Sequence, residues 1–179
     1  YFVALELARR RAANAREFTS TAAALPLAGL GFALFFLGMP AVAGNAPRFL
    51  GYVLARDAFL LALAWREETL PRLHFLGGMI AFALLALWSL TRVTPETLPW
   101  ALAAYLVFAG LHTAFPQLLE RRRPASSPAW WSQLFPPLTL VHMLLPLADH
   151  GPTPWLLWPA VVLVDVVAIG LAIATASLT

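Results

Sequence analysis

Five ionisable residues in strongly apolar surroundings are the candidates for chemistry in this sequence. Arg56 and Asp57 adjoin in LARDAFLL, and Asp165 lies in VVLVDVVAIG. His142 and His112 lie in LVHMLL and GLHTAF. Ionisable groups inside a bilayer usually pair, face the interior of a helix bundle or mark an ion or proton path. If these segments cross a membrane, the five residues form a midplane polar cluster that could bind or relay a proton.

The two adjacent charges, Arg56 and Asp57, are not expected to neutralise each other, because consecutive residues on a helix project about 100° apart. Asp165 is the expected counter-ion for Arg56, and a protonated His142 or His112 could serve Asp57. The alternative is purely structural. An Arg56–Asp165 pair would then hold two helices in register, and each histidine would bond a backbone carbonyl or a threonine.

The composition predicts that these residues belong to a membrane protein. Hydrophobic residues make up 60% of the 179 residues and charged residues only 12%, whereas roughly 25% of a soluble domain is charged. The apolar residues form blocks of about 18 to 22, which is the length that crosses about 30 Å of hydrocarbon as a helix. We therefore predict an all-α polytopic integral membrane helix bundle.

The predicted bundle is a single transmembrane unit over residues 1–179, with about six spans after a truncated N-terminal helix. The candidate spans are residues 19–39, 49–66, 70–91, 98–119, 130–149 and 155–176. The chain begins without Met, and YFVALELARRR reads as the end of a helix running into a basic flank rather than as a signal peptide. We expect a fragment of a longer membrane protein.

The second candidate span is the contested one, because Arg56 and Asp57 would lie near its middle. On an insertion scale its strong hydrophobes contribute roughly −2.5 to −5 kcal/mol, whereas a central Arg and Asp cost roughly +5 to +7 kcal/mol. The alternative is that residues 41–68 form an excursion outside the hydrocarbon, with both charges in water.

The distribution of arginines favours the spanning interpretation. If the second segment spans, the clusters at 9–16, 66–72 and 121–123 face one side, and only Arg48 and Arg92 face the other. If it does not span, Arg121 to Arg123 move opposite Arg9 to Arg11. The positive-inside bias would then largely disappear. We predict that it spans, with the Arg-rich loops cytoplasmic.

Residues near the span ends fit this topology. The seven tryptophans lie within about a turn of a predicted end, as in interfacial aromatic belts: Trp65, Trp88, Trp100, Trp130, Trp131, Trp155 and Trp158. His74 and His150 are also expected at the interface. Small residues four apart predict close helix contacts, namely Gly29 with Ala33, Gly77 with Ala81 and Gly170 with Ala174. Pro26, Pro116, Pro136 and Pro137 are expected to kink helices or, alternatively, to expose carbonyls to a substrate.

No motif for catalysis, phosphate binding or metal binding is present. The chain has no cysteine, and no two histidines share a predicted span, so we expect no enzyme activity, no cofactor and no metal site. The arginines gather in short loops, which suits anionic lipid headgroups rather than nucleic acid. The expected partners are the lipid bilayer and the remaining helices of the full-length chain, and the oligomeric state is left open.

Ala/Leu-rich segments that end in arginine clusters recur as LARRR, LAWREETLPRLHFLGG and LLERRR, and PAWWSQLFPPL opens another segment with aromatic residues and prolines. In this style the chain resembles the large bacterial family of predicted multi-pass membrane proteins called domain of unknown function twenty-three thirty-nine. The resemblance implies many more spans than six and a place in a bacterial inner membrane. It implies no known activity, cofactor or catalytic residue.

The sequence therefore leads to two functional hypotheses. The first is a non-enzymatic membrane scaffold or accessory module, in which the midplane charges specify how the helices pair. The alternative is a fragment of a transporter or proton-coupled permease that uses Asp57 and Asp165, with Arg56 as the counter-charge.

Overall fold

The computed structural model describes residues 15–66, 72–123, 133–144, 155 and 157–176, and within these ranges the chain consists of helices and short connections. The helices are α2 (Ala15–Leu37), α3 (Pro40–Ala43), α4 (Ala46–Arg66), α5 (Leu73–Arg92), α6 (Leu98–Arg122), α7 (Phe135–Leu144) and α8 (Leu157–Ala176). The all-α class predicted from the sequence is confirmed for this part of the chain.

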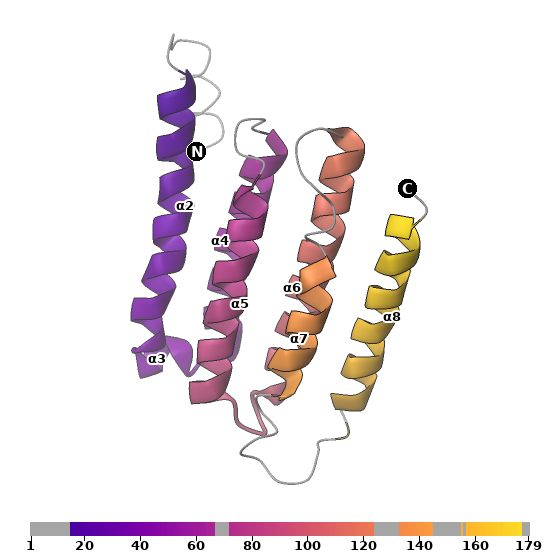
Figure 1. Ribbon diagram of the computed structural model, residues 1–179. Coiled ribbons are helices and arrows are strands. Elements are labelled where there is room, and N and C mark those ends of the chain that lie inside the picture. The colour runs from indigo at the N-terminus through magenta and orange to yellow at the C-terminus, as the bar shows by residue number, and fades with distance from the viewer. Residues whose placement is uncertain (1–14, 67–71, 124–132, 145–154, 156, 177–179) are drawn as a thin grey trace.

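The long helices lie side by side and alternate in direction along one common axis (Figure 1). Helix α2 packs on α4 and α5, α4 packs on α5 and α6, and α6 packs on α7 and α8. Helices α2 and α8 therefore lie at opposite ends of the row. The centre, where α4, α5 and α6 meet, contains two of the candidate functional residues, Asp57 and His112.

The helices fall on the segments that the apolar blocks predict. Helix α4 is continuous over 21 residues, with Arg56 in its middle. Two helices in the described part, α5 and α6, are long and apolar enough to cross a membrane. Helix α4 has comparable length but carries charged side chains at its middle and near both ends, namely Arg48, Arg56, Asp57 and Arg66.

Arginines at the helix ends show which termini lie together. The Arg123 guanidinium donates to the carbonyls of Trp65 at 3.0 Å and Arg66 at 3.2 Å, so α4 and α6 end at the same side of the bundle. At the other side, Arg92 at the end of α5 donates to the Leu37 carbonyl at the end of α2. Arginine satisfies carbonyls at a helix C-terminus in this way. The ends of α4 and α6 thus lie at one side and the ends of α2 and α5 at the other. This arrangement is expected if α4 runs the full depth of the bundle.

Two residues expected at an interface are instead part of the core. Trp88 is 1% exposed, its Nε1 donates to the Ala43 carbonyl at 2.8 Å, and its ring stacks on Phe49. His74 is fully buried and contacts the Phe115 ring. Both lie near a helix end but face inward, because α3 and α6 cover those ends. Trp130, Trp131 and His150 lie outside the described residues.

The predicted small-residue contacts are confirmed for two glycines and wrong for the third. A Cβ at Gly29 would meet Arg56, and one at Gly77 would meet Asp57 and Leu60. A Cβ at Gly170 would meet nothing within 4 Å, because this face of α8 points away from the other described helices.

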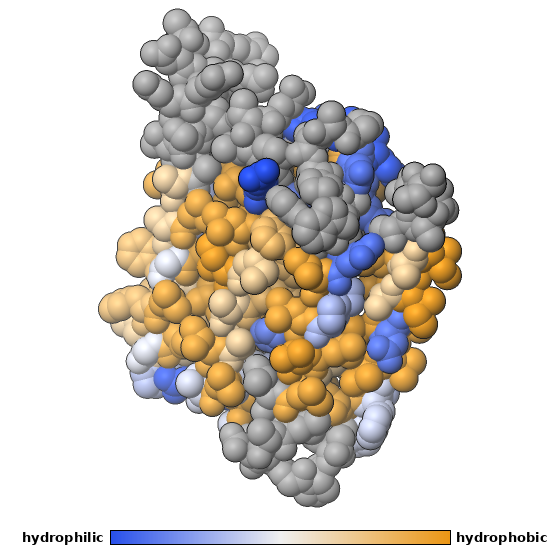
Figure 2. Space-filling view, viewed as in Figure 1, coloured by the Kyte–Doolittle hydropathy of each residue, from blue (hydrophilic) through white to orange (hydrophobic). Residues whose placement is uncertain are grey.

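The outer surface of the helical row is apolar. Figure 2 shows a broad hydrophobic band across the middle of the molecule, with more hydrophilic residues toward the two ends of the helices. Large side chains that stand exposed include Phe32, Phe35, Val162, Ile169 and Ile173. Soluble monomers rarely expose contiguous apolar surface on this scale.

Candidate functional site

The centre of the bundle contains a carboxylate and an imidazole in direct contact. Asp57 Oδ2 on α4 lies 2.7 Å from His112 Nε2 on α6, and both side chains are fully buried. Asp57 thus pairs with one of the two histidines that the sequence left open. The contact joins two helices at a depth where water does not reach either group.

Helix α5 approaches this pair through two adjacent glycines. A Cβ at Gly77 would lie 2.8 Å from Asp57 Oδ1, and a Cβ at Gly78 would lie 2.6 Å from His112 Nδ1. Both distances are shorter than van der Waals contact, so any larger residue would have to displace the pair. The role of Gly78 was missed from the sequence, although the Gly-Gly doublet in HFLGGMI is the signal that points to it.

Three aromatic rings complete the surroundings of His112. Phe108 stacks on the imidazole with the ring planes 9° apart, Phe135 lies 4.8 Å from it between ring centroids, and Phe82 meets it edge-on. All three phenylalanines are buried. The pair is therefore held in an apolar shell that strengthens its mutual attraction and makes any unpaired charge costly.

One further atom of each group lacks a hydrogen-bond partner. Asp57 Oδ1 and His112 Nδ1 are buried and make no hydrogen bond within the described part of the chain. With one proton on Nε2, the pair carries one negative charge and Nδ1 is an unprotonated acceptor. With a second proton the pair is neutral, either as an ion pair or as a carboxylic acid beside a neutral imidazole. Asp57 Oδ1 and His112 Nδ1 are therefore the two positions where a further proton could bind.

His142 makes a different set of contacts. Its Nδ1 lies 2.7 Å from the Leu138 carbonyl oxygen and its Nε2 lies 2.8 Å from the Phe82 carbonyl oxygen. This is the structural alternative expected for the histidines, in which a ring nitrogen bonds the backbone of a neighbouring helix. His142 shares the Phe82 ring with His112 but makes no hydrogen bond to Asp57.

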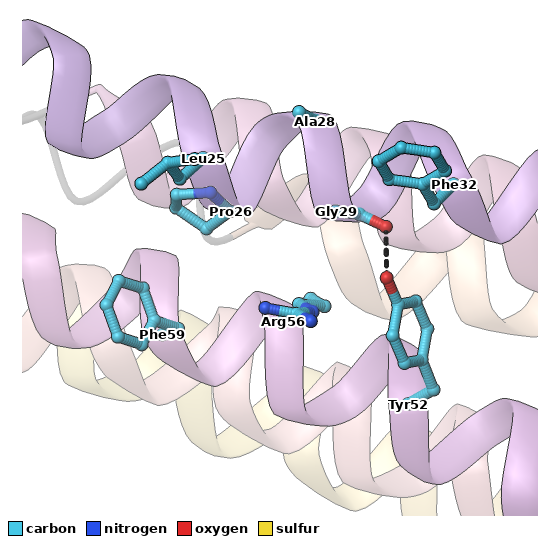
Figure 3. Close-up of a pocket in the computed structure, with 8 residues that line it drawn as sticks. All are labelled: Leu25, Pro26, Ala28, Gly29, Phe32, Tyr52, Arg56 and Phe59. Carbon is cyan, nitrogen blue, oxygen red and sulfur yellow. Dashed lines mark hydrogen bonds between the residues drawn. The ribbon is translucent and has the colours of Figure 1, made fainter. Parts of the chain in front are cut away.

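Arg56 lies apart from its sequence neighbour. It projects into a groove between α2 and α4, shown in Figure 3, while Asp57 is buried toward α6. The groove encloses about 380 Å³ and is lined by Leu25, Pro26, Ala28, Gly29, Phe32, Tyr52, Arg56 and Phe59. The guanidinium carbon lies 5.1 Å from the centre of the Tyr52 ring. The Tyr52 hydroxyl donates to the Gly29 carbonyl at 2.7 Å.

The Arg56–Asp165 pair expected from the sequence does not form within the described chain. Asp165 is exposed on α8, which packs on α6 and α7 rather than on α4. The expectation was wrong because helical rise gives the depth of a residue but not which helices are neighbours. Of the five candidates, the structure joins Asp57 with His112, places His142 nearby and leaves Arg56 and Asp165 on the outer surface.

The prolines within helices free backbone carbonyls without breaking the helices. Helix α2 continues through Pro26 and α6 through Pro116. Pro116 has no N–H to donate to the carbonyl of His112, four residues earlier. Helix α7 begins at Phe135, so Pro136 and Pro137 lie in its first turn, where the missing donors carry no cost.

Comparison with known proteins adds no assignment: no family model, curated protein or solved structure matches the chain. The resemblance to a family of multi-pass membrane proteins therefore stays a prediction, and no residue role is carried over from it.

Proposed function

We propose that this chain is a non-enzymatic helical module of a multi-pass bacterial inner-membrane protein, in which a buried Asp57–His112 pair fixes how α4, α5 and α6 pack. The observation that carries the proposal is the contact between these two side chains, fully buried, against the backbone of Gly77 and Gly78. A pair so enclosed has no room for a substrate and joins the helices in one register.

Two features support the membrane setting. The outer surface is apolar in the middle of the helices (Figure 2), and α5 and α6 have the length and composition of spans. The arginines of the α4 and α6 ends gather at one side of the bundle. In this proposal that side is cytoplasmic, as positively charged loops are in inner-membrane proteins.

A second candidate function is proton-coupled transport, and one specific observation favours it. Asp57 Oδ1 and His112 Nδ1 are buried beside each other's helices and have no other hydrogen bond among the described residues, so a transported proton would meet two free acceptor atoms there. On the same helix, the buried Thr113 hydroxyl and the Gln117 amide nitrogen also make no hydrogen bond to any residue that the structure describes. They lie within about two turns of His112, toward the Arg-rich end of α6.

The variant Asp57→Asn separates the two functions, because an amide keeps the shape and a hydrogen bond to His112 but cannot exchange the carboxyl proton. The control is Glu96→Gln, because the Glu96 carboxylate is exposed in the turn between α5 and α6, away from the pair. Purified chain in lipid vesicles containing a pH-sensitive dye is given a proton gradient, and thermal unfolding is measured in parallel. The module hypothesis predicts no protein-dependent proton flux and near-normal unfolding for both variants.

The opposite result has a distinct signature. A protein-dependent proton flux that Asp57→Asn abolishes while unfolding stays normal would refute the module hypothesis and establish the second candidate. In contrast, Asp57→Ala removes the partner of His112 and is expected to destabilise the fold by about 1–3 kcal/mol, the cost of a buried unsatisfied group.

A further inference from the structure

Of the five candidate residues, Arg56 and Asp165 are left outside the core, and they lie at similar depth, Arg56 beside the terminal helix α2 and Asp165 on the terminal helix α8. Arg56 lies about 15 Å along α4 and Asp165 about 12 Å along α8, by the helical rise. Both helices begin at the same side of the bundle (Figure 1). A difference of a few ångströms is within the reach of an arginine side chain.

Neither charge has a partner of opposite sign within the part of the chain that the structure describes. The Arg56 side chain meets the Tyr52 ring and packs against Gly29. The guanidinium lies too deep to reach headgroups, because about 15 Å of helix separates it from either end of α4. Charges at such depth normally pair, so each residue needs a partner from outside the described chain.

The surface around Asp165 has the form of a helix contact. Trp158, Val162, Asp165, Ile169 and Ile173 are exposed, and their spacing of four, three, four and four residues places them in one stripe along α8. The opposite face of α8, with Ala160 and Val164, is buried. A single charged residue in the middle of an apolar seam sets register and partner choice in associating helices.

The groove that contains Arg56 is complementary to this stripe. Its lining is apolar apart from the guanidinium and the Tyr52 hydroxyl, and the α2 residues Gly29 and Ala28 between Leu25 and Phe32 are small (Figure 3). Small residues of this kind let a second helix approach closely in a membrane. A helix that runs parallel to α4 would place one side chain at Arg56 and its apolar neighbours against Leu25 and Phe32.

We propose that the Arg56 groove between α2 and α4 binds the Asp165 stripe of α8 from a second copy of this chain. This inference rests on the proposed function, because it places both charges at membrane depth. If two copies are related by a rotation about the membrane normal, Asp165 and Arg56 keep the same depth in each copy. The groove of one copy then binds the stripe of the next, so the copies associate head to tail. Such a heterologous contact generates a ring or an open row, depending on the rotation between copies.

Charge reversal tests the pairing in both directions. The variants are Arg56→Asp and Asp165→Arg, and Arg48→Asp, an exposed arginine of α4 outside the groove, is the matched control. Each reversal places like charges at the contact and is expected to weaken association of identical copies about tenfold or more. A mixture of the two variants restores the contact, because the acidic groove of the first then faces the basic stripe of the second. In the reciprocal contact, the natural Arg56 of the second variant faces the natural Asp165 of the first.

Association is measured as energy transfer between donor- and acceptor-labelled chains in lipid vesicles, over a range of protein-to-lipid ratios. The proposal predicts transfer for the natural chain and the control, loss in each single variant alone, and recovery in the mixture. Unchanged transfer in either single variant would overturn it. Loss without recovery in the mixture would also overturn it, because the groove would then bind another acidic group.

Flotation of the vesicles with the chain is recorded in the same experiment. If the chain does not float with the vesicles, the membrane proposal itself fails. If it floats and resists carbonate extraction but shows no energy transfer, only the head-to-tail pairing is overturned.

Discussion

Arg56 and Asp57 are neighbours in sequence but point into different environments: Asp57 is fully buried against His112, whereas Arg56 is exposed in the groove beside α2. Consecutive helical residues diverge in this way. One side chain of LARDAFLL therefore holds the bundle together and the other is available for a contact outside it.

The glycine doublet on α5 gives a sharp stability test. Gly78→Ala would place a Cβ 2.6 Å from His112 Nδ1, and we expect it to destabilise the fold by about 1–3 kcal/mol, as overpacking of a core does. The matched control is Gly110→Ala, because a Cβ at Gly110 meets nothing within 4 Å.

In the control, alanine favours the helix over glycine by about 1 kcal/mol, so Gly110→Ala should be neutral or stabilising. Chemical unfolding in detergent micelles measures both variants. Equal effects at the two positions would show that α5 does not pack on the Asp57–His112 pair.

The two buried histidines should differ in their contribution to stability. His112→Leu leaves the Asp57 carboxyl buried without its partner, and removing one member of a buried pair costs about 3–5 kcal/mol. His142→Leu removes two ring-nitrogen contacts with backbone carbonyls, of which a neutral imidazole can donate to one. An interhelical hydrogen bond in membrane proteins averages about 0.6 kcal/mol. Unfolding free energies of the two variants, measured side by side, check the order. A larger loss in His142→Leu than in His112→Leu would contradict the assignment of Asp57 and His112 as the central pair.

The turn between α5 and α6 should respond to pH through Glu96. The Thr94 hydroxyl donates to the Glu96 carboxylate at 2.6 Å, and this bond, followed by one from the Glu96 backbone, lowers the pKa of Glu96 below its ordinary value. Because the folded-state pKa is lowered, the stabilisation is present above the ordinary carboxyl pKa. It is lost as pH falls through the lowered value.

Removing the Thr94 hydroxyl should therefore return the pKa of Glu96 toward its ordinary value. The carboxyl resonance of Glu96, followed by NMR titration in micelles, reports this for Thr94→Val. Thr91→Val is the control, because the Thr91 hydroxyl bonds the Leu87 carbonyl instead. If Thr91→Val raises the Glu96 pKa as much as Thr94→Val does, the shift does not come from the Thr94 bond.

The elements of this fold could be predicted because the length of an apolar block sets the length of a helix. Even α4, with Arg56 and Asp57 at its middle, is a continuous helix. The neighbours of each helix could not be predicted, since hydropathy gives depth but not rotation. For this reason the sequence could not decide whether His112 or His142 is the partner of Asp57. For the same reason it wrongly paired Asp165 with Arg56.

Residues near helix ends show the same limit. Trp88 and Trp100 both lie within about a turn of the connection between α5 and α6, yet Trp88 is 1% exposed and Trp100 is 51% exposed. The inward direction of Trp88 depends on α3, whose Ala43 carbonyl accepts the Trp88 N–H. Because Trp88 and Ala43 are far apart in the sequence, no local sequence pattern predicts their contact.

The central claim is that α4 crosses the membrane and places Arg56 and Asp57 near its middle. The absence of cysteine allows a direct test, with single cysteines at Ala41, Thr69, Glu96 and Ser126 and a membrane-impermeant maleimide added to intact cells. Ala41 and Glu96 are exposed, near the start of α4 and in the turn before α6.

The account predicts that the cysteines at Ala41 and Glu96 label in intact cells, and that those at Thr69 and Ser126 label only after permeabilisation. The contrary result is labelling of the cysteines at Ala41, Thr69 and Ser126 in intact cells, with no labelling of the cysteine at Glu96. In that case α4 does not cross the membrane. Arg56 and Asp57 would then lie outside the hydrocarbon, and both the buried-pair module and the head-to-tail contact would lose their basis.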